Sequence, residues 1–490
     1  MRHHLKSKAH ANRRSIVATF AVSVLMVAGG YAKADSAGSG AGWNVEFDLY
    51  FANRINIKEH FLNTEGSVTA GPRGLYASSP LNLYFENTEV GYSWIVGAGL
   101  SVDWKERVGF TLNADSGELK YRGLSFYEPK PRCSEPEPDP RCGWTSNGRD
   151  LAEEARSTLF AREAYFHWNA GDGEWIHGWI GKRRIVVASG YLLDNWSLGG
   201  GFGADLDEAG IAPLRLEVQA VLPNGDFTAE GKRSPLVHFK LTWPFGWLEN
   251  LSLWGAWFRD GDGAMAEALE NTWASLMGLY GIEIRDVGSR GNIFWAGADA
   301  NFVFSQASLF LSGAVEFGSS DLTITLLNPF TLQEETRTGN IELLGGMAEV
   351  SAYFDPTDLL TLGGFFLFLS GETTTDNRSD VGGSYNGFIS VYPFITRTNI
   401  FFSGGMNQNI SARNLSSSGV NGRGVFAPGI TAGVEPAEKL LLRLTSALLF
   451  SHGPHAISGS HFYGWETDFN LEWRFENFAS LLFEADYMLT

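Results

Sequence analysis

Charged side chains recur at every second position within several apolar segments of the chain. Arg215, Glu217 and Gln219 alternate with apolar residues along 214–220. The same alternation holds in other segments for Lys240, Arg443, Glu466, Asp468 and Arg474. A period of two indicates strands whose two faces differ. Charges of both signs on one face could line a water-filled channel and select among ions and solutes.

Long strands with one apolar face must carry these charges. Trp43–Phe51 alternates cleanly, and Phe462–Phe475 does so over a longer stretch. The apolar faces reach roughly the 9–11 residues that a tilted strand needs to cross a bilayer. A soluble β-sandwich would also alternate, but it would bury core residues where this chain has Glu, Asp and Arg. The sequence therefore predicts an all-β fold: a single large antiparallel transmembrane β-barrel of about 18 strands.

The composition excludes several other classes of protein. The aromatic content of 13% argues against a disordered chain. Two cysteines cannot hold 490 residues together as a disulfide-rich scaffold. A net charge of −18 argues against nucleic acid as a partner. The mean hydropathy of −0.10 argues against a bundle of membrane-spanning helices.

The first 34 residues have the three parts of a secretory signal peptide. A basic stretch precedes the apolar segment 16–30, and Ala32-Lys33-Ala34 provides a cleavage site before Asp35. We therefore expect a signal peptide at 1–34 and an outer-membrane barrel at 35–490 of a Gram-negative bacterium, surrounded by lipid and lipopolysaccharide. Removal of 1–34 takes away six basic residues, which leaves 31 against 55 acidic ones and a net charge of −24.

Short turns alternate with long polar stretches along the chain, which predicts short periplasmic turns and long extracellular loops. The expected turns are Lys105–Arg107, Asn169–Trp175, Pro244–Asn250, Ser305–Gln306, Asp355–Asp358, Phe394–Thr396 and Glu435–Glu438. The long loops include Gly318–Asn340 and Gly371–Gly382. This division gives 18 to 19 strands, although an even number is usual. Either one strand is misassigned, with 192–222 the weakest-patterned region, or a final strand is missing after Thr490.

Three further groups of residues could carry chemistry. Cys133 and Cys142 flank an acidic, proline-rich segment, and a local disulfide in an outer loop is favoured over two free thiols. His452, His455 and His461 have no zinc-ligand spacing, so solvated histidines are favoured over a metal site. The run Gly199–Gly203 lacks a phosphate-loop context and indicates close packing. No metal or cofactor is expected.

Two stretches resemble the alginate-export porin family of outer-membrane proteins. They are Ala161–Trp168 followed by Trp179–Arg184, and Gly464–Asp468 near the end of the chain. The resemblance implies an 18-stranded monomeric barrel that exports an acidic polysaccharide through an arginine-rich constriction. Arg162 and Lys182 take the positions of the family's two arginines and would form a basic lumen gate. Arg184 belongs to the same stretch and is also predicted to line the pore.

Departures from the family pattern widen the range of substrates. Lysine replaces arginine at position 182, and a lysine is a poorer bidentate partner for a carboxylate. Glu484 and Asp486 stand where the family has basic residues. The sequence thus predicts a passive channel, not an enzyme, for small solutes or an anionic polysaccharide. The alternatives are a structural or adhesive barrel and, less favoured, a hydrolase at the barrel rim that uses the three histidines.

Overall fold

The computed structural model describes most of the strands and part of the connections between them. The described residues are 18–34, 42–59, 89–105, 107–115, 119–122, 160–171, 174–223, 234–245, 248–261, 263–266, 268–269, 283–328, 333–373, 382–391, 393, 395, 397–398, 401, 416–419, 422–454, 460–475 and 479–489. Cys133, Cys142 and His455 lie outside this set, so the predictions about them are untested.

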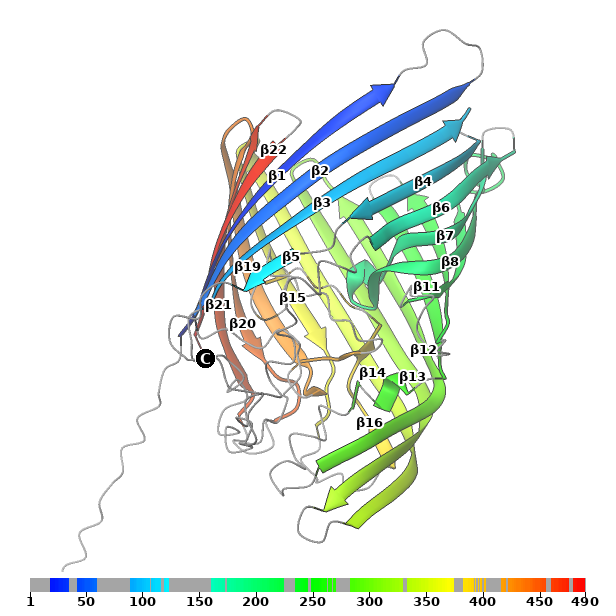
Figure 1. Cartoon of the computed structure of the whole chain (residues 1–490), viewed down its shortest axis with the longest axis vertical. Helices are drawn as coiled ribbons and strands as arrows, with labels where there is room; N and C mark the ends of the chain where they lie inside the picture. Colours follow the sequence, from blue (N-terminus) through cyan, green and yellow to red (C-terminus); the bar gives the residue numbers. More distant parts are fainter. Residues whose placement is uncertain are drawn as a thin grey trace, which may run out of the picture.

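Period-two segments of the sequence form the strands of one large sheet (Figure 1). The strands are β1 (Ala18–Ala34), β2 (Trp43–Glu59), β3 (Glu89–Trp104), β4 (Val108–Asp115), β5 (Leu119–Arg122), β6 (Phe160–Ala170), β7 (Ile176–Val187), β8 (Leu193–Asp205), β9 (Arg215–Leu222), β10 (Leu236–Phe245), β11 (Leu248–Asp260), β12 (Glu283–Val303), β13 (Ala307–Asn328), β14 (Gln333–Thr357), β15 (Leu360–Leu369), β16 (Gly383–Tyr385), β19 (Val425–Ala437), β20 (Leu440–Phe450), β21 (Phe462–Phe475) and β22 (Ala479–Leu489). A separate small sheet pairs β17 (Ile389–Ser390) with β18 (Ser416–Ser417).

The large sheet closes on itself. Successive strands pair antiparallel, and β22 pairs with β1, so that Tyr487 lies opposite Phe20. Of the 20 strands in the sheet, β5 continues the position of β4 beside β3, and β16 only adds to β14 in parallel. The ring therefore has 18 positions, which confirms the predicted antiparallel barrel of about 18 strands.

Strand β1 consists of residues that the sequence assigns to a signal peptide. Its pairing with β2 runs from Phe20 opposite Glu59 to Ala34 opposite Val45. Cleavage after Ala34 would remove this strand and leave β2 and β22 without their shared neighbour. The cleavage itself and the division at residue 35 stay predictions.

The two faces of the barrel differ as the alternation predicts. Large apolar side chains are exposed on the outer face, for example Ile180 at 61%, Leu344 at 65% and Ile430 at 68%. Acidic side chains are buried on the inner face, among them Glu316 and Asp468. Burial of a carboxylate inside a barrel requires donors in the lumen. Inward-folded connections supply part of them. Among the described residues, no helix has the length and apolar character to cross a membrane.

The connections show which of the predicted strand and loop boundaries are correct. The region 192–222 forms β8 and β9, which pair in unbroken register. The turn expected at Phe394–Thr396, of which only Ile395 is among the described residues, is wrong as a turn between strands of the wall, because β15 pairs directly with β19. The expected loop Gly318–Asn340 is also wrong, since most of it belongs to β13 and β14. Together with β12, which pairs with β13 as far as Glu283 opposite Leu327, these strands form the lower end of the sheet in Figure 1.

Candidate functional site: an acid-anchored constriction

A stretch of the β15–β19 connection folds into the lumen. We call the described residues within 383–401 the inward segment. Its first anchor is Glu316 of β13, whose Oε2 accepts hydrogen bonds from the backbone N of Ile389 at 2.6 Å and from Nε1 of Trp295 at 3.1 Å. The Trp295 nitrogen also donates to the carbonyl of Ile389 at 3.2 Å. Glu316 is fully buried, so this carboxylate and the segment shield each other from water.

A second anchor holds Arg397 of the inward segment. Its guanidinium forms an ion pair with buried Glu349 of β14 and donates to the hydroxyls of Tyr353 at 3.3 Å and Tyr191 at 3.2 Å. Tyr191 belongs to the short connection between β7 and β8, so Arg397 links that connection to β14. Burial raises the pKa of the Tyr191 phenol, which keeps it neutral beside the guanidinium.

The third anchor lies on β21. Glu466 Oε2 accepts from Thr398 Oγ1 at 2.9 Å and from the backbone N of Phe401 at 3.0 Å. The inward segment also contacts the connection between β7 and β8, where the backbone N of Val391 donates to the carbonyl of Leu192 at 2.7 Å. Strands β13 and β21 stand well apart around the ring. The inward segment therefore crosses the lumen and narrows it.

Seven of the predicted pore residues share the inner face with these anchors. Arg215 pairs with Asp205 at 2.6 Å, and Arg474 pairs with Glu472 at 2.7 Å. Strand register places the remaining five on the inner face. Glu217 and Lys240 lie opposite each other, Arg443 lies opposite Asn470, Glu466 opposite Ala447, and Asp468 opposite Asp486. Their position matches the prediction, and their effect on selectivity stays a prediction.

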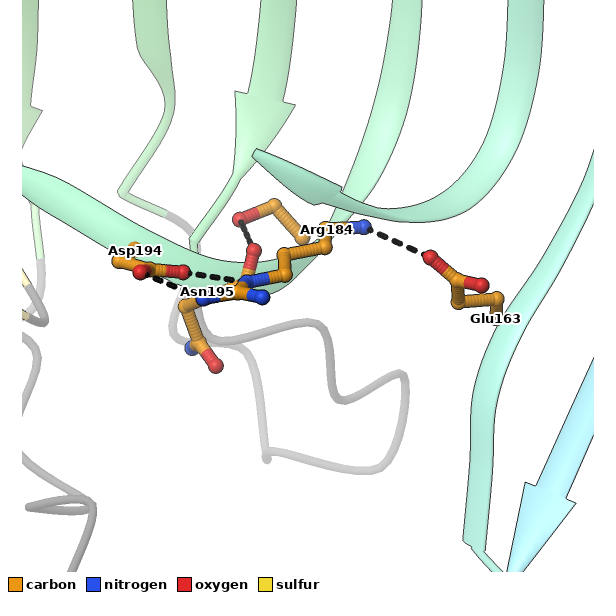
Figure 2. A network of polar contacts seen from close by, with 5 residues as sticks. Glu163, Arg184, Asp194 and Asn195 are labelled. Carbon is orange, nitrogen blue, oxygen red and sulfur yellow. Dashed lines mark hydrogen bonds and ion pairs between the residues drawn. The ribbon is translucent and has the colours of Figure 1, made fainter. Parts of the chain in front are cut away.

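The three residues expected from the family resemblance to line the pore lie elsewhere. Lys182 pairs with Ala164 and Leu198, on the face that carries exposed Ile180. Arg184 shares this outer face and binds Asp194 through two hydrogen bonds of 2.7 and 2.8 Å. Figure 2 shows the side chain turned toward Asp194, while its backbone nitrogen faces Glu163. The prediction of lumen positions for Lys182 and Arg184 is therefore wrong.

Arg162 lies at a β-bulge of β6. The register with β4 shifts there, since Ala161 pairs with Ala114 but Glu163 pairs with Asn113. The Arg162 guanidinium lies over the Trp196 ring, 5.0 Å from its centroid. Trp196 has the outward parity of Phe202, which is 53% exposed. Arg162 also has the parity of Phe166, which is 42% exposed, so the alternation along β6 itself places the expected gate arginine on the outer face.

Several inner-face residues were missed by the sequence prediction of the site. Glu316 alternates with Val315 and Phe317, and this pattern alone could have identified it. Arg183 takes the lumen position assigned to Arg184, since it pairs with Ser197 and shares the parity of buried Trp179 and Ile185. No sequence signal indicated Ile389 and Arg397, because their contacts depend on how the connection folds back.

Two of the three predicted histidines, His452 and His461, are described, and each lies next to backbone atoms of the protein. His452 Nδ1 lies 3.1 Å from both the backbone N and O of Gly371, and its ring meets Phe368 edge-on. His461 Nδ1 lies 3.2 Å from the carbonyl of Ser451. Within the described ranges, no group of three His, Cys, Asp or Glu side chains could hold a metal ion.

Comparison with known proteins identifies no relative by sequence. No family model matches the chain, and no curated protein matches it. Similar solved structures include Acinetobacter baumannii OccAB1 (8% identity, TM-score 0.38, 96% of each chain covered), Pseudomonas aeruginosa OccK9 (11%, 0.37, 96% of this chain and 97% of that chain) and Salmonella typhi OmpF in complex with daunomycin (8%, 0.36, 96% and 97%). At these scores the similarity adds no argument, so the case for function rests on the residues of this chain.

Proposed function

We propose that the protein is a passive channel in the outer membrane of a Gram-negative bacterium. The observation that carries this proposal is a closed ring of 18 positions, one of them β1 of the predicted signal peptide, with an apolar outer face and a charged inner face. A closed barrel leaves no unpaired edge in hydrocarbon, which makes it the β-structure suited to a bilayer. A ring of this size is too wide for its own side chains to fill. The inward segment therefore sets the width of the path.

The constriction favours small solutes over a polymer. Acidic anchors hold a backbone segment across the bore, and Lys182 and Arg184, two of the residues expected in a basic gate, stand on the outer face. Export of an anionic polysaccharide is the finer hypothesis that the family resemblance suggests. It would require the inward segment to leave the lumen, because a chain polymer needs a continuous path.

Recordings from purified protein in planar bilayers test the channel directly. We expect stepwise currents from the wild type and larger steps from a variant in which 388–398 is replaced by glycine and serine. A matched control is Glu335→Gln, which alters an exposed carboxylate bound only to Arg337 among the described residues. An absence of steps from both the wild type and the replacement variant would refute the channel.

A structural or adhesive barrel is the second candidate, because the inward segment crosses the lumen. Its signature in the same recordings is distinct. The wild type would be silent under every condition, whereas the replacement variant would conduct. That result would reassign the inward segment from a filter to a permanent plug.

A further inference from the structure

The inner face of β6–β8 holds an arginine that is supported by rings. The guanidinium carbon of Arg183 lies 5.5 Å from the Tyr165 ring centroid and 5.8 Å from that of Trp179. Both distances are within the range of a cation–π contact. Among the described residues, no carboxylate forms an ion pair with Arg183. Arg215, Arg397 and Arg474, which share the inner face, each pair with one.

The glycine run of β8 makes this arrangement possible. Gly201 faces the lumen opposite Trp179, and a Cβ at Gly201 would come within 2.3 Å of Trp179 Nε1. The indole can therefore lie flat against β8 only because residue 201 has no side chain. Trp179 is 6% exposed, so it has little room to move elsewhere. The close packing expected of this run thus has a specific purpose, which is to seat one ring beneath Arg183.

A guanidinium held through its faces keeps its edges available. The N–H groups of arginine lie in the plane of the group and match the two oxygens of a carboxylate. Arg183 itself is exposed, whereas its aromatic supports are partly or fully buried. The rings fix the plane of the group before a ligand arrives, which reduces the entropy lost on binding.

We propose that Arg183, positioned by Tyr165, Trp179 and Gly201, is a binding site for the carboxylate of a passing solute. The inference rests on the proposed channel function and deepens it by naming a residue that determines specificity. Glu163, on the neighbouring strand β6, accepts hydrogen bonds from Asn113 Nδ2 at 2.6 Å and from the backbone N of Arg184 at 3.5 Å.

Block of single-channel current tests the site. Glucuronate and glucose have similar size and differ in the carboxylate, so the pair isolates the charge. We expect glucuronate to interrupt the wild-type current and glucose to have no such effect. Arg183→Gln should need roughly tenfold more glucuronate or above for the same block, because a charge-assisted pair is lost. Arg183→Lys should lie between the two, since it keeps the charge but not the planar fork.

Arg184→Gln is the matched control, because it removes the same charge one residue away on the outer face. It should leave the block unchanged. Gly201→Val should weaken the block as Arg183→Gln does, by displacing Trp179. If Gly201→Val fails to form a barrel, Trp179→Leu replaces it in the comparison. An equal block in Arg183→Gln and the wild type, or an equal loss in Arg183→Gln and Arg184→Gln, would overturn the site. If these variants still give current steps like those of the wild type in salt alone, the channel function stands and only the binding site is refuted.

Discussion

Glu316→Ala should release the first anchor of the inward segment. The change removes the acceptor for the backbone N of Ile389 and one of two acceptors for Trp295 Nε1. The indole keeps the carbonyl of Ile389 as its partner, but the buried amide of Ile389 is left with none. Leaving one buried donor unsatisfied costs about 1–3 kcal/mol. That cost corresponds to a rise of about 5- to 150-fold in the ratio of undocked to docked segment.

Single-channel recording measures this shift. We expect Glu316→Ala to open to a larger conductance far more often than the wild type. Glu316→Gln keeps an oxygen acceptor of the same shape, so its behaviour should remain close to that of the wild type. Unchanged conductance levels and dwell times in Glu316→Ala would refute the reasoning, because they would show that this carboxylate does not hold the segment.

Three further predictions follow from other contacts. Arg397→Met should destabilise the barrel by about 3–5 kcal/mol in urea unfolding, since it leaves Glu349 buried without its charge partner, and Arg397→Met with Glu349→Leu should recover most of the loss. Ile180→Lys should cost up to about 2–4 kcal/mol on folding into lipid vesicles, while Gln219→Lys on the inner face should cost much less; equal costs would contradict the assigned faces. The mass of protein purified from outer membranes should correspond to a chain that starts at Asp35 if the signal peptide is cleaved, whereas a retained β1 predicts the full mass.

The alternation of the sequence was sufficient to predict the barrel and most of its inner face. Glu466, Asp468 and Arg443 occupy regular strands, and period two assigns their faces without knowledge of the partners. The same rule puts Arg162 with outward-facing Phe166, against the lumen position that the family resemblance implies, and it gives no sign of the bulge there. It also gives no choice between Arg183 and Arg184, since both are basic and the neighbouring glycine is uninformative.

The constriction could not be predicted from the sequence either, and the physical reason is a different one. The sequence pattern predicts a turn between strands of the wall at 394–396, whereas β15 pairs directly with β19. On either side of this stretch, the backbone N of Ile389 donates to Glu316 and the backbone N of Phe401 donates to Glu466, on strands distant in the chain. Contacts between residues so far apart in the chain depend on the whole ring, so local pattern contains no information about them.

The pairing of β22 with β1 has a consequence for assembly. Hairpins between neighbouring strands bring together residues close in sequence, but the closing pair of this ring joins Phe20 to Tyr487. After cleavage at Ala34, closure would instead have to join β2 to β22, and either pairing must form across nearly the whole chain. Contacts of such separation are slow to form, because the intervening chain has to be ordered first. Until then the two terminal strands present open edges that invite pairing with other chains. During delivery to the membrane, the edges of both terminal strands must therefore be covered until the two strands pair and close the barrel.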